Sequence, residues 1–428
     1  MRRGRFILRR ASGALWGVAW LIPALGSAQS VLTWEQIKER FEAGNPTLKA
    51  SRLSIDESRA GEITAFLRPN PELSLVVDGL QVAPNQGTWR PLSGVEQTPG
   101  MSYLHERQHK RELRRDSAQQ STAVAESAYS DQERSLLFNL RNAFVQILQA
   151  KAVLQNAQQN LTSWDREVQV NRQRVNAGDA ALVDLQRLEL QRAQFESDYE
   201  TALVNLRTAK IQLLMLLNDR TPIARFDITG LYDFNPDLMP LDDFKAAAIE
   251  ARPDLKEANQ NVELAKINHQ LAVANGSVDL TFSAWYSHNP SFSNMFANQT
   301  VGGSVSIPLR IFDRNQGEKA KTQIEIGRNE RLRDATQATI LSDVESAYWT
   351  LAQALNLLKP YKDKYLSLAQ DNLNRISFSY RNGGASLLDF LDAEKAYRDT
   401  RLAYLNLIGS YLTAAAQMNM AVGREVVR

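Results

Sequence analysis

The segment Arg381–Gln417 reads RNGGASLLDFLDAEKAYRDTRLAYLNLIGSYLTAAAQ, and it decides the fold because the chain carries an earlier copy of it. The copy, residues 178–217, reads GDAALVDLQRLELQRAQFESDYETALVNLRTAKIQLLMLL. Both copies begin with G-x-A-x-L-x-D-x4-E and continue with the apolar spacing of a long helix. When the copies are superimposed, Gly178, Ala180, Leu182, Asp184, Glu189 and Tyr199 fall on Gly383, Ala385, Leu387, Asp389, Glu394 and Tyr404. Such a repeat indicates an internal duplication.

The duplication extends toward the amino terminus. A second match joins Asn45-Pro46-Thr47-Leu48-Lys49 to Arg252-Pro253-Asp254-Leu255-Lys256. The offset in residue number between these two segments is nearly the same as between the two helix openings. Agreement at two distant places predicts that almost the whole chain consists of two copies of one unit. The hydrophobic pattern of each unit predicts a helix, two strands, a long helix and a further helix.

Breaks in the hydrophobic period, together with Gly and Pro, set the expected boundaries. In the first repeat, residues 29–217, we expect strands at about 71–80 and 89–98 and long helices at about 101–177 and 180–217. In the second repeat, residues 252–423, we expect strands at about 278–288 and 300–311 and long helices at about 317–380 and 385–421. Residues 218–251 form a linker and 424–428 a tail, and Pro360 should kink or interrupt its helix.

The first residues predict a secretory signal peptide. Several arginines are followed by a short apolar run and by Gly26-Ser27-Ala28, which is typical of a signal peptide over residues 1–28, cleaved after Ala28. Its removal takes away five arginines and no acidic residue, so the formal net charge of +2 becomes slightly negative. This balance, without a basic run, argues against nucleic-acid binding. The absence of cysteine excludes disulfides, a nucleophilic thiol and an acylated amino-terminal cysteine.

The predicted strands indicate how the protein would meet a membrane. In the second repeat Leu280, Phe282 and Tyr286 alternate with polar residues over about ten positions, which fits a transmembrane β-strand. A soluble hairpin remains the alternative, because this signal is weak in any one segment. Four strands cannot close a barrel, and an open edge in lipid leaves backbone groups unpaired. Two chains would give eight strands with a filled interior, whereas three give twelve strands and a lumen, so we expect a homotrimer.

The longest predicted helix suits two kinds of architecture. No glycine or proline occurs from Met101 to Ala177, and Leu136, Leu140 and Phe144 recur at coiled-coil spacing. A narrow apolar stripe with two wet faces is expected of a helix in a hollow tube, and also of a solvated coiled coil. A periplasmic adaptor or coiled-coil scaffold protein is therefore the alternative function. It does not explain two pairs of amphipathic strands at equivalent points of the repeats.

The layout resembles the TolC-like outer-membrane efflux protein family, over residues of about 31 to 423. The most specific parts are the two helix openings and the segment from Ile307-Pro308-Leu309 through Phe312-Asp313-Arg314-Asn315-Gln316-Gly317, which is similar to the strand-to-helix junction of the heavy-metal, CzcC-like branch. The resemblance implies a mainly α-helical protein with transmembrane β-structure: a trimeric twelve-stranded outer-membrane β-barrel, continued by a periplasmic α-helical barrel. An equatorial belt would come from residues 31–45, 218–251 and the carboxyl terminus.

The resemblance also implies a function and partners. The trimer would be a passive exit duct of a tripartite efflux pump that carries substrates from the periplasm to the exterior. Its partners would be outer-membrane lipid, a periplasmic adaptor and an inner-membrane RND-type transporter. The missing cysteine is a departure, because many relatives carry a lipid there. The exported substrate, whether metal cation, drug or solvent, stays open.

In this family the periplasmic tip of the helical barrel narrows to a gate made by a tyrosine, an arginine and inward-facing aspartates. Tyr380 takes the tyrosine place, and the aspartate places fall on Asp389, Asp392 and Asp184. The arginine place is Ala385, which puts the usual closing contacts in doubt. For Asp389 an equal alternative is a capping box with Ser386, because an acid in the first turn suits the helix dipole. Gly178, Gly383 and Gly384 are the expected turns at the helix tips.

We expect no enzyme, no cofactor and no metal site. Four histidines, no cysteine and no Gly-rich phosphate loop leave no catalytic constellation. His105 and His109 are spaced so that they could share a helix face, but two nitrogens without a third ligand make a weak metal site. A solvated helix start is the preferred interpretation of their charged surroundings.

Overall fold

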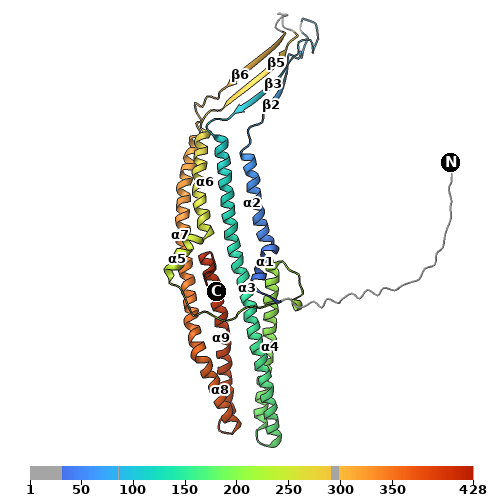
Figure 1. Ribbon diagram of the computed structural model, residues 1–428. Coiled ribbons are helices and arrows are strands. Elements are labelled where there is room, and N and C mark those ends of the chain that lie inside the picture. Colours follow the sequence, from blue (N-terminus) through green and yellow to red (C-terminus); the bar gives the residue numbers. More distant parts are fainter. Residues whose placement is uncertain (1–30, 85, 291–297, 428) are drawn as a thin grey trace, which may run out of the picture.

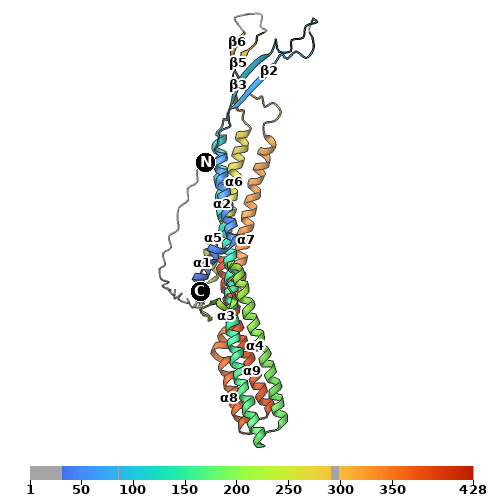
Figure 2. The same ribbon diagram turned by 90° about the vertical axis from the view of Figure 1, so that its right-hand side faces the viewer.

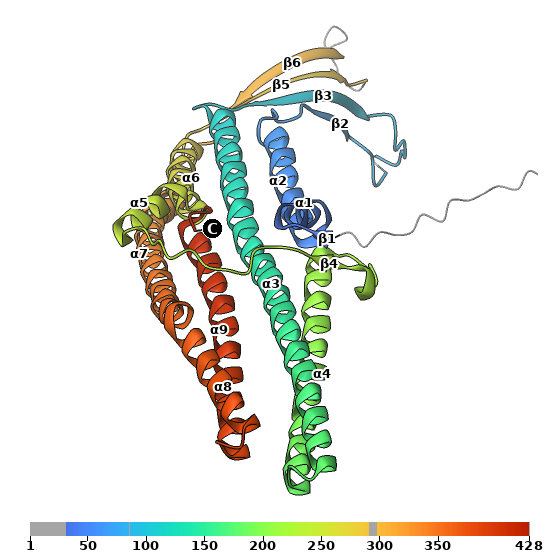
Figure 3. The same cartoon turned by 60° about the horizontal axis from the view of Figure 1, so that its bottom comes forward.

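The computed structural model describes residues 31–84, 86–290 and 298–427, so the predicted signal peptide lies outside the described residues. The molecule is a long rod. A small β-sheet stands at one end, helices run along its length, and two helical hairpins turn at the other end (Figures 1 and 2). Short elements lie at mid-height, where the carboxyl terminus also lies (Figures 1 and 3).

The two repeats have the same order of long elements. The first contains α1 (Trp34–Gly44), α2 (Pro46–Ala65), β2 (Glu72–Asp78), β3 (Glu96–His105), α3 (Lys110–Ala177) and α4 (Leu182–Leu217). The second contains α5 (Leu241–Ala251), α6 (Pro253–Asn275), β5 (Leu280–His288), β6 (Gln299–Ser306), α7 (Gln316–Pro360), α8 (Leu366–Arg381) and α9 (Leu387–Val422). Between them, a short helix (Ile223–Arg225) precedes β4 (Asp227–Ile228), which pairs in parallel with β1 (Val31–Leu32).

Two predicted boundaries were wrong at the same junction. The strand expected at 89–98 lies at Glu96–His105, and the helix expected from residue 101 begins at Lys110. The absence of glycine and proline permits a helix here, but β3 pairs with β2 on one side and with β5 on the other, and this pairing overrides local helix propensity. The left-handed residues Gln108 and His109, with φ of 59° and 54°, then separate strand from helix.

Pro360 interrupts its helix as predicted, although the interruption is mild. A π-helical turn, Tyr361–Tyr365, joins α7 to α8. Proline lacks the N–H that an α-helix needs, and a wider turn accommodates the missing hydrogen bond while the chain keeps its direction. The helix α7 therefore continues into α8 along the rod (Figure 1).

The sheet is antiparallel, with the order β2-β3-β5-β6 among the described strands. The central pair of strands joins the repeats, because β3 of the first pairs with β5 of the second, with Met101 opposite Ala284. Gly302 of β6 lies opposite Trp285, and a Cβ atom at residue 302 would come within 2.5 Å of the indole ring. Glycine thus allows the indole to lie across the neighbouring strand.

Helices of each repeat stack end to end at mid-height, α2 above α4 and α6 above α9 (Figure 1). In the first repeat Asn45 bridges the two ends: its Nδ2 donates to the Leu216 carbonyl at 3.0 Å, and its Oδ1 accepts from the Leu48 N–H at 3.0 Å. Arg252 holds the matching position in the second repeat, and its Nη1 donates to the Ala421 carbonyl at 3.0 Å. These side chains satisfy backbone groups that helix ends leave unpaired.

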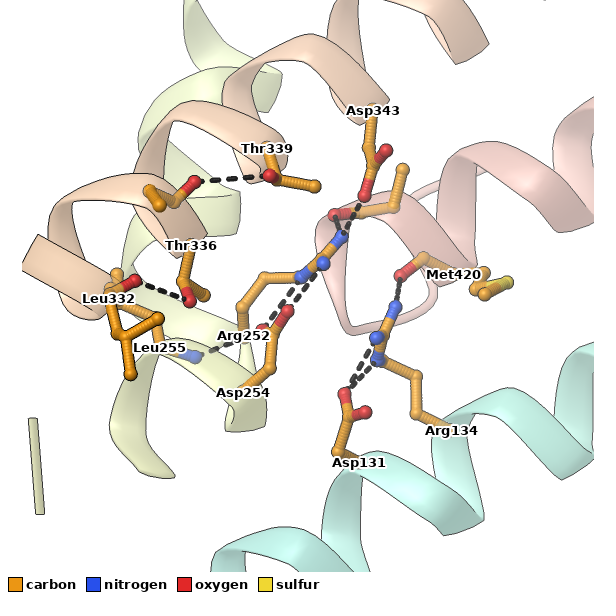
Figure 4. Close-up of polar contacts among 12 residues, drawn as sticks. Asp131, Arg134, Arg252, Asp254, Leu255, Leu332, Thr336, Thr339, Asp343 and Met420 are labelled. Atoms are coloured by element: carbon orange, nitrogen blue, oxygen red, sulfur yellow. Dashed lines mark hydrogen bonds and ion pairs between the residues drawn. The ribbon is translucent and has the colours of Figure 1, made fainter. Parts of the chain in front are cut away.

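Arg252 is buried and needs charged partners (Figure 4). Its guanidinium contacts the Asp254 carboxylate at 2.6 Å and that of Asp343 at 3.2 Å. Burial acts to raise the pKa of Asp254, but the hydrogen bonds and charge of Arg252 outweigh it and hold that pKa below its usual value. The junction therefore ties α6, α7 and α9 together.

No helix in the described ranges is long and apolar enough to cross a bilayer.

Candidate channel gate at the helix tips

Two hairpin turns, between α3 and α4 and between α8 and α9, form the end of the rod opposite the sheet (Figure 1). Gly178 and Gly383 adopt left-handed backbone angles, with φ of 84° and 77°. A Cβ atom at either residue would meet open space, so the backbone angle rather than crowding favours glycine there. At Gly384 a Cβ atom would lie 2.9 Å from the Ser379 hydroxyl, so the turn is tight at this residue.

Asp389 forms the predicted capping box at the start of α9. The Asp389 N–H donates to Ser386 Oγ at 3.2 Å, and the Ser386 N–H donates to Asp389 Oδ2 at 3.0 Å. Hydrogen bonds from Ser386 lower the pKa of Asp389, and its carboxylate is exposed at the tip. The helix α4 has no such cap, because Ala181 precedes it.

Tyr380 is buried in the interior of the tip, with 7% of its surface exposed. Its hydroxyl donates to Asn171 Oδ1 of α3 at 2.9 Å, and its ring stacks on Phe390 of α9 with centroids 5.2 Å apart. Burial raises the pKa of Tyr380; the nearby Arg174 guanidinium opposes this and the Asp184 carboxylate adds to it. Tyr380 thus connects the second hairpin to the first.

An aromatic stack extends this connection across the tip. Trp164 of α3 stacks on Phe195 of α4, with ring centroids 4.8 Å apart, and on Phe390 of α9, with ring centroids 6.0 Å apart. The Trp164 Nε1–H donates to the Leu188 carbonyl at 2.9 Å, which satisfies the polar atom of a buried indole. Neither Trp164 nor Phe390 was expected at the tip from the sequence, although both occupy apolar positions of their helices.

Arg381 makes a second polar connection between the two hairpins, which was not expected from the sequence. Its guanidinium forms an ion pair with Glu167 of α3. Arg381, the last residue of α8, lies four residues before the position where the family resemblance placed an arginine. Ala385, at that position, packs against the apolar core of the tip. A basic residue beside the Gly-Gly turn was the signal that could have revealed it.

The predicted aspartates are divided between the two hairpins of the chain, with Asp389 and Asp392 on α9 and Asp184 on α4. Asp392 is exposed one turn beyond Asp389, and Asp184 is half-buried in the first turn of α4. Within the described residues, no hydrogen bond or ion pair joins Asp184 to either of the other two. The tip therefore presents carboxylates on both hairpins, held apart by the aromatic stack.

The two candidate histidines do not share a helix face, which corrects that expectation. His105 is the last residue of β3, and His109 precedes α3 in a left-handed conformation. Because α3 begins at Lys110 and not at about residue 101, both histidines lie before the helix. In the described part of the chain, no group of three or more side chains could hold a metal ion.

Comparison with known proteins agrees with this fold. The family described as "Outer membrane efflux protein" matches residues 39–219 and 246–424, one span in each repeat. The chain is 23% identical to the cobalt-zinc-cadmium resistance protein CzcC of Cupriavidus metallidurans, over 93% of this chain and 91% of that one. It is 22% identical to TolC of Salmonella enteritidis, over 71% of this chain and 64% of that one.

A solved structure of CusC has the same fold. It superimposes with a TM-score of 0.76 at 18% identity, covering 91% of this chain and 92% of that chain. The protein is an outer-membrane channel of a tripartite efflux pump, which removes the alternative of a periplasmic adaptor or scaffold, and it is not an enzyme. The two spans of the family match cover most of both repeats, and the chain accordingly belongs to the outer membrane efflux protein family.

Proposed function

We propose that three copies of this chain form the exit duct through which a pump expels divalent metal cations from the periplasm. The observation that carries the assembly is the four-stranded sheet, whose edge strands β2 and β6 have a neighbour on one side only within the described residues. Unpaired backbone groups are costly in lipid. Pairing of β6 with β2 of the next copy closes a twelve-stranded barrel and leaves no edge.

The surface of the sheet supports this placement. Every residue of β2 is exposed, including Leu73 at 86% and Leu75 at 68%. On the opposite edge strand Val301 is 83% exposed. Apolar side chains at such exposure are unfavourable in water, whereas lipid or a neighbouring copy would cover them.

The helix tips form the gate in this proposal. Tyr380 and Arg381 hold the second hairpin against the first through Asn171 and Glu167. Opening moves the α8–α9 hairpin away from α3 and breaks both contacts. With three copies around one axis, Asp184, Asp389 and Asp392 each become a ring of three carboxylates, which favours cations at the constriction.

The partners in this proposal are a periplasmic adaptor at the helix tips and an inner-membrane RND-type transporter that supplies the energy. The metal substrate rests on the similarity to the cobalt-zinc-cadmium resistance protein CzcC, together with the acidic tip. The chain itself has no nucleotide-binding loop, so it conducts passively.

Membrane fractionation tests the trimeric assembly, and metal tolerance of cells tests the metal substrate. The protein should extract from outer membranes as a detergent-stable trimer that dissociates on heating. A deletion strain should become sensitive to cobalt, zinc or cadmium and recover when the chain is restored. A monomer in detergent would refute the shared barrel, whereas a trimer without any metal phenotype would refute the metal substrate alone.

A further inference from the structure

A cavity of about 310 Å³ lies at mid-height, outside the tip and the sheet. It is half open and is lined by residues of α1, α3, the start of α6, the end of α9 and the segment that follows α9. Trp34, Leu137, Phe138, Ala416 and Met420 contribute apolar surface. The charged residues in its wall are Lys38, Glu133, Arg134, Arg141, Arg424 and Glu425. The volume is at the lower end of the range for small-molecule sites.

The two arginines on α3 differ in their hydrogen bonding. Arg134 is fully engaged: it contacts Asp131 at 2.6 Å and donates to the Met420 carbonyl (Figure 4). The guanidinium carbon of Arg141 lies 4.5 Å from the centroid of the Trp34 ring and 5.8 Å from that of Phe144. In the described ranges Arg141 makes no hydrogen bond and no ion pair.

The surroundings of Arg141 leave its donors without an acceptor. The N–H groups of a guanidinium lie in its own plane. When the guanidinium lies over an indole face, an oxygen can therefore reach these groups from the side. Burial lowers the pKa of Arg141, and the carboxylates of Glu425 and Glu35 only partly oppose this from a distance. Arg141 is half-buried, and among the described residues no acceptor engages its donors, so an oxygen ligand in the cavity can pair with them in place of water.

The cavity fits one chemical class better than others. A carboxylate matches a guanidinium through two parallel hydrogen bonds. Glu133 and Glu425 also line the cavity, so a singly charged anion meets less repulsion than a phosphate. The apolar surface of Trp34, Phe138 and Met420 would cover a hydrocarbon body next to the charged group.

We propose that this cavity binds a small organic carboxylate, with the carboxylate on Arg141 and an aromatic or aliphatic body against Trp34 and Phe138. The site lies at mid-height, away from the helix tips and from the sheet. Lys38 and Arg424, also in the cavity wall, add positive charge.

Thermal unfolding of the purified full-length protein in detergent tests the proposal, with millimolar sodium benzoate as probe. Benzoate should raise the Tm at constant ionic strength, whereas benzyl alcohol and inorganic phosphate should have less effect. Arg141→Met keeps the aliphatic stem on Trp34 and removes the donors. It should weaken benzoate binding by about tenfold or more, because a charge-assisted pair is lost.

The matched control is Arg40→Met. Arg40 is an exposed arginine of α1 that forms an ion pair with Asp219 at 3.8 Å, and its variant should bind benzoate as the wild type does. Equal stabilisation by benzyl alcohol or by phosphate would overturn the assignment of a carboxylate. Benzoate binding that survives in Arg141→Met would overturn the site. A lowered Tm in Arg141→Met without ligand, with no response of the wild type to benzoate, would assign Arg141 to packing on Trp34 instead.

Discussion

Removing one hydroxyl should loosen the helix tips. The substitution Tyr380→Phe keeps the stack on Phe390 but deletes the hydrogen bond to Asn171 Oδ1, which is 2.9 Å long and buried. Loss of such a bond, with Asn171 left without its partner, costs about 1–3 kcal/mol. If three tips open together, the closed state loses about three times this amount, and the closed-to-open ratio falls by at least about a hundredfold.

Single-channel recording in planar bilayers measures this effect as open probability. The matched control is Tyr404→Phe: Tyr404 is a half-buried tyrosine of α9, and its hydroxyl has no hydrogen bond within the described residues. The control should behave as wild type. An unchanged open probability in Tyr380→Phe, with a lowered Tm, would show that the hydrogen bond stabilises the fold and does not hold the gate.

The remaining predictions concern the sheet, the acidic tip and the helix junction. Val305→Arg should cost about 2–4 kcal/mol at mid-bilayer and reduce the yield of trimer in outer-membrane extracts; normal yield would show that this face does not meet lipid. Asp389→Asn combined with Asp392→Asn should abolish cation preference in bilayer recordings while the trimer stays intact; unchanged selectivity with a lowered Tm would leave only the capping role. Asp254→Asn should lower the free energy of unfolding by about 1–3 kcal/mol at neutral pH, because Arg252 loses a charged partner. Because the pKa of Asp254 is lowered in the folded state, its contribution to the free energy of unfolding is complete above its ordinary pKa and is lost as the pH falls through the folded-state value. The Tm should therefore fall less steeply with acid in the variant than in the wild type. Identical profiles of Tm against pH would refute the coupling between Asp254 and Arg252.

The sequence by itself determined the duplication and most of the long elements. The left-handed turns at Gly178 and Gly383 needed no tertiary information, and neither did the capping box of Ser386 and Asp389, because such features depend on neighbouring residues only. The family followed from the same local patterns. Pro360 likewise acted through its own missing N–H.

Tertiary structure alone decided where contacts between distant segments fall. Strand β3 replaced a predicted helix start because β2 and β5 supply its hydrogen bonds from outside the segment. Tyr380 and Asn171 are 209 residues apart, and no local pattern pairs them. Arg252 occupies the same place in its repeat as Asn45 and makes the equivalent contact to a helix end, at Ala421, but its ion pair with Asp343 of α7 has no counterpart at Asn45 among the described contacts. The reason is physical: local propensity acts over a few residues, whereas the energy of a buried polar group depends on whichever helix packs against it.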